Sequence, residues 1–174
     1  MKQIRWFDRS FQFGATQNIF PAVLERLAGT PVRLEEKCML IPHELLAKGL
    51  EGKWSIKENV GHLIDLEPLW QGRLHDILNG REELRPADLQ NTLTTQANHN
   101  AVLLEDLLSS FRQVRKQTLQ LLEPLKEEDV FKAALHPRLK IPMRTMDLFL
   151  FVAEHDDHHL ARITELAKVI DKQI

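Results

Sequence analysis

A stripe of apolar residues with the spacing of an α-helix runs through residues 144–169 and reaches Ile170. Residues three or four positions apart share one face of a helix, and the steps along this stripe are four, three, four, four, three and four. The segment therefore predicts one long amphipathic helix with a face that should be buried. The positions of the stripe are Leu148, Val152, His155, His159, Ile163, Leu166 and Ile170.

Three more helices are predicted, at about 17–42, 55–79 and 97–123. The second has the clearest start, because Ser55 and Glu58 have the spacing of a capping box. In that motif the two side chains bond reciprocally to the backbone of the first turn. A typical Asn-Gly stop follows at the other end of the same helix.

The composition agrees with an all-α protein. Only 7 glycines occur among 174 residues, and no run of β-branched residues alternates with polar ones over the length of a strand. Four helices of these lengths predict a four-helix bundle in a single domain, residues 1–174. Longer connections at 81–96 and around His136 leave the order of the helices open. The first helix allows for a break near Gly29-Thr30-Pro31, where Thr30 could cap a restart that has Pro31 at its first position.

The charge pattern lacks the usual signals for binding to nucleic acid or to a membrane surface. Formal net charge is -2 with a pI of about 6.4, and acidic and basic residues are mixed without a basic stripe or polybasic run. No window has the roughly 18 apolar residues that a membrane span needs, and the N-terminal residues lack the pattern of a signal peptide. Cys38 is the single cysteine, so no intramolecular disulfide can form and a cytoplasmic location is expected.

Two histidines occupy the centre of the stripe that should be buried. His155 and His159 are one helical turn apart, and each brings a polar ring whose burial requires a partner. One interpretation is that they are core histidines bonded to their neighbours. The other is a divalent metal, which accepts a lone pair from both neutral rings at once. His158 lies about 100° around the helix from His159 and is predicted to belong to the flank.

His62 in the second helix is the candidate for a third ligand. It lies next to the inward face of that helix, and by itself it is a common kind of partly buried surface histidine. Together with His155 and His159 it would complete a three-histidine site drawn from two facing helices. Such a site leaves a coordination position for water or substrate, which is the pattern of a catalytic rather than a structural metal.

Two carboxylates are candidates for a supporting role. Asp156 is interpreted either as a general base or as a partner that holds the second ring nitrogen of a metal ligand. Glu58 is a second candidate base, although its part in the capping box competes with that role. Asp157 is predicted to face solvent.

Other positions carry weaker signals. Residues 136–138, His-Pro-Arg, are interpreted either as a turn or as a rim that brings a histidine or arginine to the pocket. Residues 98–100 are interpreted as a cap for the third helix, and His43 and His75 as solvated surface. The aromatic side chains of residues 6–13 are expected to pack either on the bundle or on a second subunit.

Two segments together resemble the DinB/YfiT-like superfamily. Residues 54–63, WSIKENVGHL, are similar to its W-S-x-x-E-x-x-x-H-L segment, and residues 154–159, EHDDHH, are similar to its H-x-x-x-H segment. The order of the helices also agrees, so the resemblance covers nearly the whole chain. It implies a four-helix bundle, often dimeric, with one divalent metal held by three histidines, which correspond here to His62, His155 and His159.

The resemblance also implies a choice of activities. Family members with an assigned activity are S-transferases that use glutathione, mycothiol or bacillithiol, and many others are described as metal-dependent hydrolases. We therefore expect a thiol S-transferase acting on a small electrophile, with a hydrolase that uses a metal-activated water and a non-catalytic metal-binding protein as alternatives. Three imidazoles suit zinc or nickel, and iron or manganese are further choices. The expected partners are a small-molecule substrate, a low-molecular-weight thiol and a second copy of the chain in a homodimer.

Overall fold

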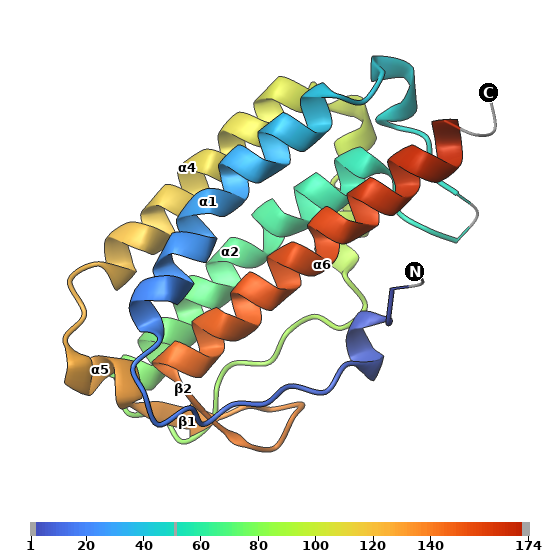
Figure 1. Cartoon of the computed structure of the whole chain (residues 1–174). Helices are drawn as coiled ribbons and strands as arrows, with labels where there is room; N and C mark the ends of the chain where they lie inside the picture. The colour runs from blue at the N-terminus through green and yellow to red at the C-terminus, as the bar shows by residue number, and fades with distance from the viewer. Residues whose placement is uncertain (1–2, 51, 172–174) are drawn as a thin grey trace.

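Four long α-helices lie side by side in the computed structural model, which describes residues 3–50 and 52–171 (Figure 1). The predicted four-helix bundle is therefore confirmed. Each predicted helix has a counterpart, although the observed ends differ. The long helices are α1 (Phe20–Met39), α2 (Ile56–Leu78), α4 (Leu104–Leu122) and α6 (Thr145–Asp171). The side chain of Ile170, the last position of the predicted stripe, lies outside the part that the structure describes.

The helices are not arranged as a simple up-and-down bundle. α1 packs closely against α4 and α6, and α2 packs closely against the same two helices. Successive long helices are therefore neighbours only at the step from α2 to α4, whereas α1 and α2 lie diagonally across the bundle, as do α4 and α6. This arrangement places α2, which carries His62, beside α6, which carries His155 and His159 (Figure 1).

Shorter elements fill the connections. A two-stranded antiparallel hairpin, in which Ala134 lies opposite Met143, closes one end of the bundle. The hairpin was not predicted, because strands of three residues are too short to show alternation. The short elements are the 3-10 helices Trp6–Asp8, His43–Leu45 and His99–Ala101, the helices α3 (Thr92–Gln96) and α5 (Glu127–Phe131), and the strands β1 (Ala133–Leu135) and β2 (Pro142–Arg144).

The break that the sequence allows in the first helix does not occur, because α1 continues through Pro31. A proline inside a helix has no N–H for the carbonyl four residues earlier, which is that of Leu27. Here the Leu27 carbonyl oxygen accepts a hydrogen bond from Nη1 of Arg115 at 3.3 Å instead. Thr30 does not cap a restart; its hydroxyl donates to the carbonyl of Arg26 at 3.0 Å. A side chain from α4 therefore compensates for the missing helical bond.

The predicted start of the third helix is also wrong. Asn98 adopts a left-handed conformation with φ 50°, which separates α3 from α4, and α4 begins only after Leu103. Residues 98–100 therefore do not cap this helix. His99 turns toward α2 instead, where its Nε2 lies 2.9 Å from an Asp65 oxygen.

Two apolar clusters occupy the two halves of the bundle, and polar groups lie between them. One cluster is centred on residues such as Leu27, Phe149 and Val152, and the other on residues such as Phe111 and Ile163. The described N-terminal residues pack on the first cluster. Their aromatic contacts with the bundle come from Trp6, Phe11 and Phe13.

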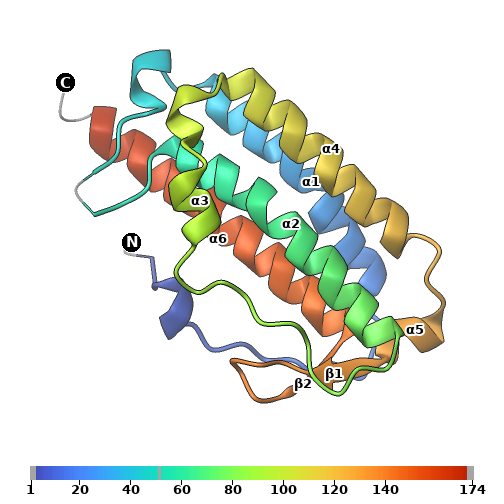
Figure 2. The same ribbon diagram turned by 180° about the vertical axis from the view of Figure 1, so that it is seen from behind.

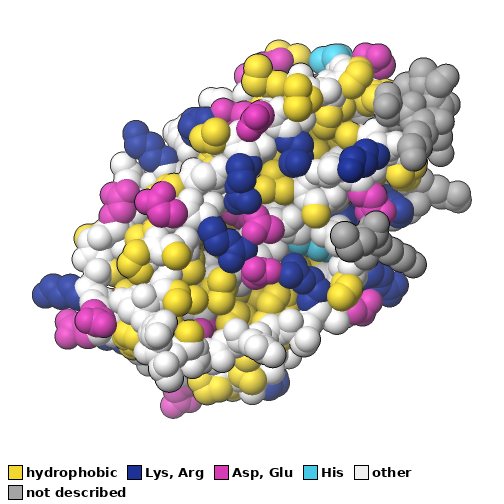
Figure 3. All heavy atoms as spheres, viewed as in Figure 1, with side chains coloured by type: hydrophobic (Ala, Val, Ile, Leu, Met, Phe, Trp, Pro, Cys, Tyr) yellow, Lys and Arg dark blue, Asp and Glu magenta, His cyan; other side chains and the backbone are white. Residues whose placement is uncertain are grey.

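The N-terminal segment and the connection after α2 cross the same side of the bundle. Figure 2 shows both lying along α2 and α6, on the side away from α1 and α4. The face drawn in Figure 3 mixes Lys and Arg with Asp and Glu, without a large patch of one sign. Within residues 3–50 and 52–171, no helix is both long and apolar enough to cross a membrane.

Candidate metal centre

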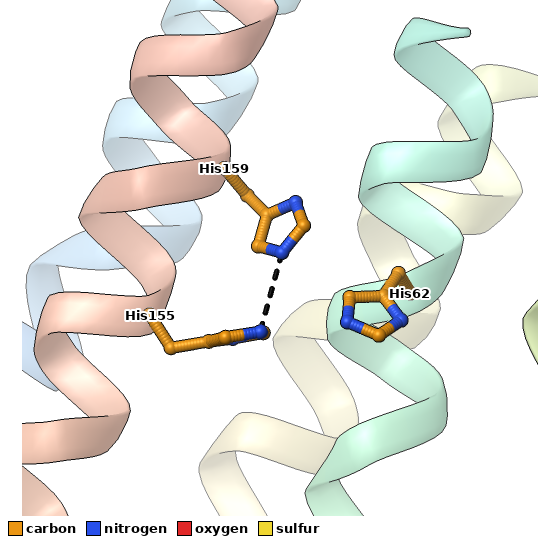
Figure 4. A group of neighbouring side chains, drawn as sticks. All are labelled: His62, His155 and His159. Atoms are coloured by element: carbon orange, nitrogen blue, oxygen red, sulfur yellow. Dashed lines mark hydrogen bonds between the residues drawn. The ribbon is translucent and has the colours of Figure 1, made fainter. Parts of the chain in front are cut away.

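Three histidines from two helices converge in the polar layer of the bundle. His62 comes from α2, and His155 and His159 come from successive turns of α6 (Figure 4). One ring nitrogen of each lies within 4.8 Å of the others, and all three side chains are buried. The structure thus brings together the three ligands predicted from the sequence.

The ring of His62 is oriented by a chain of hydrogen bonds behind it. Thr94 donates its hydroxyl hydrogen to Asp65 at 2.7 Å, so its oxygen can accept from Nδ1 of His62 at 3.0 Å. His99 approaches the same Asp65 oxygen from the other side. This arrangement puts the proton of His62 on Nδ1 and leaves the Nε2 lone pair free for a metal.

His159 is oriented in the same way by Asn59. The amide nitrogen of Asn59 donates to the carbonyl of Ser55 at 2.7 Å, so its oxygen is the atom that faces Nδ1 of His159 at 2.8 Å. Nδ1–H of His159 therefore donates to Asn59, and Nε2 carries the free lone pair. The same capping turn that starts α2 thus sets the tautomer of a histidine on α6.

The arrangement of His155 and His159 fits a shared metal ion better than a hydrogen bond. Their Nε2 atoms are 3.2 Å apart, and Nδ1 of His155 is buried with no partner among the described residues. Two nitrogens bound tetrahedrally to one zinc at 2.0–2.1 Å lie roughly 3.3 Å apart. An ion at this point would therefore satisfy both lone pairs with little movement of either ring.

Burial keeps the three rings neutral, which is the form that binds a metal. It lowers the pKa of His155 and of His159 well below the ordinary value, and it lowers the pKa of His62 to about 4. Neighbouring imidazoles lower the pKa of His155 and His159 further. At neutral pH all three rings therefore offer a lone pair without first releasing a proton.

A pocket of about 580 Å³ opens beside the triad. Its walls come from the N-terminal segment, the turn before α2, α2 itself, the connection after α2, the β1–β2 connection and α6. All three tryptophans line it, and the Trp54 ring packs against His62 with their centroids 4.6 Å apart. A site with three protein ligands on the wall of a largely apolar pocket has room for a small molecule next to a metal.

The two candidate carboxylates have other partners. Both Asp156 oxygens accept from the Arg115 guanidinium, at 2.6 and 3.1 Å, and Asp156 is not part of the pocket wall. Among the described residues Asp156 bonds to no histidine ring, and its role as a base or as a support for a ligand stays a prediction. Glu58 accepts from the backbone N–H of Ser55 at 2.7 Å and completes the capping box.

The histidines outside the triad either line the pocket or lie at the surface. His158 lines the pocket from the flank, and its Nδ1 lies 3.0 Å from the amide nitrogen of Gln3. His136 is buried in the pocket wall rather than in a simple turn. His43 and His75 are exposed, as predicted. Asp157 is partly exposed, with 35% of its side chain accessible, and forms ion pairs with Arg26 and Arg33.

Arg73 is the main pocket residue that sequence reasoning missed. It follows Leu66 and Trp70 at steps of four and three, so it continues the inward stripe of α2. A charged side chain at a buried stripe position was the available signal. Trp6 was assigned to packing alone, whereas it also forms part of the pocket wall.

Replacement of Gly61 by alanine is expected to destabilise the fold by about 1–3 kcal/mol. A Cβ at this helical position would lie 2.2 Å from the His99 ring, which Asp65 holds in place. The control is Gly29→Ala in α1, where an added Cβ meets no atom within 4 Å; that change is expected to stabilise by about 0.4–1 kcal/mol. Urea denaturation followed by circular dichroism measures both, and equal effects would contradict the proposed close packing at Gly61.

A four-helix bundle whose adjacent α2 and α6 carry three converging histidines defines a class of helical proteins with an open candidate metal centre. Comparison with known proteins agrees with this description of the fold. The chain belongs to the DinB superfamily, whose family model matches residues 12–163. The family suggested by the two sequence segments is therefore confirmed.

Solved structures share this fold over nearly the full chain. YfiT from Bacillus subtilis, described as "a probable metal-dependent hydrolase with an unusual four-helix bundle topology", is 20% identical with a TM-score of 0.79, and the match covers 94% of each chain. A protein from Streptococcus pneumoniae is 13% identical with a TM-score of 0.69, covering 90% of this chain and 94% of that one. At these identities the likeness shows the fold. No protein with a curated description matches the chain.

Proposed function

We propose that this protein is a metal-dependent enzyme that joins a low-molecular-weight thiol to a small electrophile. The observation that carries the proposal is the convergence of three neutral imidazoles on the wall of a pocket of about 580 Å³. His62, His155 and His159 would hold the ion, with zinc or nickel the proposed metal. A divalent ion held there supplies Lewis acidity, which favours the deprotonated form of a thiol or water beside it.

The protein itself offers no sulfur nucleophile at this place. Cys38 is its single cysteine, packs in the second apolar cluster and is buried. Burial raises the pKa of its thiol to about 12, so the thiolate is scarce at neutral pH. The thiol must therefore come from a cosubstrate, whose sulfur would bond to the electrophilic carbon while the leaving group departs with the electrons of the broken bond.

The position of the carboxylates favours transfer over hydrolysis. Asp88 is the one carboxylate among the described residues that line the pocket, and it accepts from the backbone N–H groups of Gln90 and Thr92 at 2.9 and 2.6 Å. A thiol is acidic enough to react without a strong base, whereas attack by water benefits more from one. The apolar walls would exclude water and hold the electrophile.

Hydrolysis is the second candidate function, favoured by the description of the structural relative YfiT as a probable metal-dependent hydrolase. A homodimer and a cytoplasmic location remain predictions that accompany either activity.

The test is turnover with the purified full-length chain, with and without chelator. Glutathione, mycothiol and bacillithiol would each be incubated with an aryl halide or epoxide, and loss of thiol would be followed. Metal-dependent loss of thiol is the expected result. Turnover of esters or amides without a thiol would replace this proposal with hydrolysis, and no turnover of either kind would favour a non-catalytic metal-binding protein.

A further inference from the structure

The pocket beside the triad is cationic although the chain carries a net charge of -2. Its lining contains four Lys or Arg side chains and one carboxylate, that of Asp88. Arg162 is neutralised by Glu165 at 2.7 Å, and Lys53 lies in an exposed turn. The other two cations, Arg73 and Arg138, lie together with His136 in one part of the wall.

Arg73 is a buried guanidinium without a carboxylate partner among the described residues. Its side chain is 2% exposed, its Nε donates to the carbonyl of Arg85 at 3.1 Å, and its guanidinium lies over the Trp70 ring. The nearest acidic group on its own helix, Asp76, is held by Arg85 through both carboxylate oxygens. Burial lowers the pKa of Arg73 to about 10 although the charge of Asp76 acts in the opposite direction, so Arg73 stays charged at neutral pH. A buried and unpaired charge is costly unless a ligand compensates it.

His136 adds a second donor at the same place. Its Nδ1 accepts from the backbone N–H groups of Arg138 and Leu139, both at 3.2 Å, so the neutral ring carries its proton on Nε2. That Nε2 lies 3.1 Å from Nη1 of Arg73, which also carries only hydrogens. Burial and the two nearby arginines lower the pKa of His136 to about 4, so it stays neutral. In this tautomer both atoms are donors, so neither satisfies the other.

Arg138 brings a further positive charge to this wall. It is half-buried, and its guanidinium lies over the Phe7 ring at 5.2 Å rather than beside a carboxylate. Asp88, the carboxylate in the lining, already accepts from the start of α3. Among the described residues no carboxylate forms an ion pair with Arg73 or Arg138, so this part of the wall offers donors and positive charge to a ligand.

We propose that Arg73, His136 and Arg138 form a binding site for an oxyanion, so that the substrate of the enzyme is a small molecule with a carboxylate or phosphate group. That this anion is a substrate rests on the proposed function, whereas the binding of an anion at this site does not. The Trp70 ring contacts both the Arg73 guanidinium and, at 5.9 Å between centroids, the His155 ring. The anion site and the triad therefore lie within reach of one small molecule, with an aromatic or alkyl body between them.

Binding of simple probes tests this site directly. The probes are benzoate, phenyl phosphate and neutral benzamide, which share one ring, and binding to the full-length chain is followed by calorimetry or by fluorescence of the three tryptophans in the pocket. The two anions are expected to bind at least about tenfold more tightly than benzamide, and the tighter of the two identifies carboxylate or phosphate. Equal affinity for benzamide would overturn the proposal.

Variants separate this site from other sources of anion binding. Arg73→Met and Arg138→Met are each expected to reduce the preference for anions by about 10- to 100-fold. Arg112→Met, which removes a charge that pairs with Glu35 outside the pocket, should leave the preference unchanged. If Arg73→Met does not fold, as judged by circular dichroism, Arg138→Met alone decides. A preference retained in the folded variants overturns the proposal.

Measurements after chelator treatment separate this proposal from the proposed function. The preference for anions is expected to persist without metal, because it depends on the arginines and His136. Its disappearance on chelation would mean that the anion binds the metal, which overturns the site. Persistence together with a lack of any turnover would sustain the anion site and reject the thiol transferase.

Discussion

Replacing His155 or His159 with alanine is expected to abolish stoichiometric binding of a divalent metal. Each change removes one of two nitrogens that lie 3.2 Å apart and face the same point. Loss of a hydrogen-bond partner behind a ligand typically lowers metal affinity about 10- to 100-fold, so loss of a ligand itself should exceed that range. Elemental analysis of protein purified without a histidine tag, after dialysis against zinc or nickel, measures the effect.

Two control variants make this experiment specific. His158→Ala alters the neighbouring histidine, which lines the pocket but does not belong to the triad, and it should retain the metal. His75→Ala removes an exposed histidine of α2 and should also retain it. Full metal occupancy in a His155→Ala, His159→Ala double variant would reject the site.

Replacing Arg115 with methionine is expected to lower the free energy of unfolding by about 3–5 kcal/mol. The Arg115 guanidinium is buried and donates to Glu67 at 2.5 and 2.8 Å and to Asp156 at 2.6 and 3.1 Å. It also donates to the Leu27 carbonyl, so this one side chain of α4 contacts all three other long helices. Its removal would leave two buried carboxylates without a counter-charge and one helical carbonyl without a donor.

The charges in this cluster depend on one another. Burial alone would lower the pKa of Arg115, but the carboxylates of Asp156 and Glu67 raise it. Burial raises the pKa of Glu67, and the charge of Asp156 acts in the same direction. The Arg115 guanidinium therefore stays charged, and it provides the counter-charge for the two buried carboxylates.

Urea denaturation of Arg115→Met measures the effect, and Arg112→Met is the matched control. Arg112 lies one turn earlier in α4 and pairs with Glu35 at the surface, where an ion pair contributes at most about 1 kcal/mol. A triple variant that also replaces Glu67 with methionine and Asp156 with leucine should regain much of the lost stability, because no charge is then left buried. A loss below about 1 kcal/mol for Arg115→Met would contradict this account.

The bundle and two members of the triad, His155 and His159, could be predicted from helical periodicity, whereas His62 was added because it lies next to the inward face of a second helix. His155 and His159 interrupt an apolar stripe one turn apart, and that position is visible in the sequence alone. The capping box at Ser55 and Glu58 likewise marks the start of α2 correctly, since the bonds involved are local. Local sequence signals gave a wrong expectation where a residue far away in the chain supplied a hydrogen bond that the helix itself lacks. At Pro31 the helix continues because Arg115, 84 positions later in the chain, bonds to the Leu27 carbonyl.

Asp156 and Arg73 show a different limit of prediction from sequence, namely the identity of a buried side chain's partner. Both lie on or beside buried helix faces, so the sequence indicates that each needs a partner, but it does not name that partner. The crossed order of the helices brings Arg115 to Asp156 and turns this aspartate away from the pocket. The connection after α2 and the β1–β2 connection bring Arg85 and His136 to Arg73.

The sequence by itself determined the four helices, the face that each buries and the place of His155 and His159 on one such face, because these follow from interactions within one or two helical turns. Only the tertiary structure decided which helices are neighbours, which carboxylate is held by an arginine and where a pocket opens. Those outcomes depend on contacts between residues far apart in the chain, which no local spacing encodes.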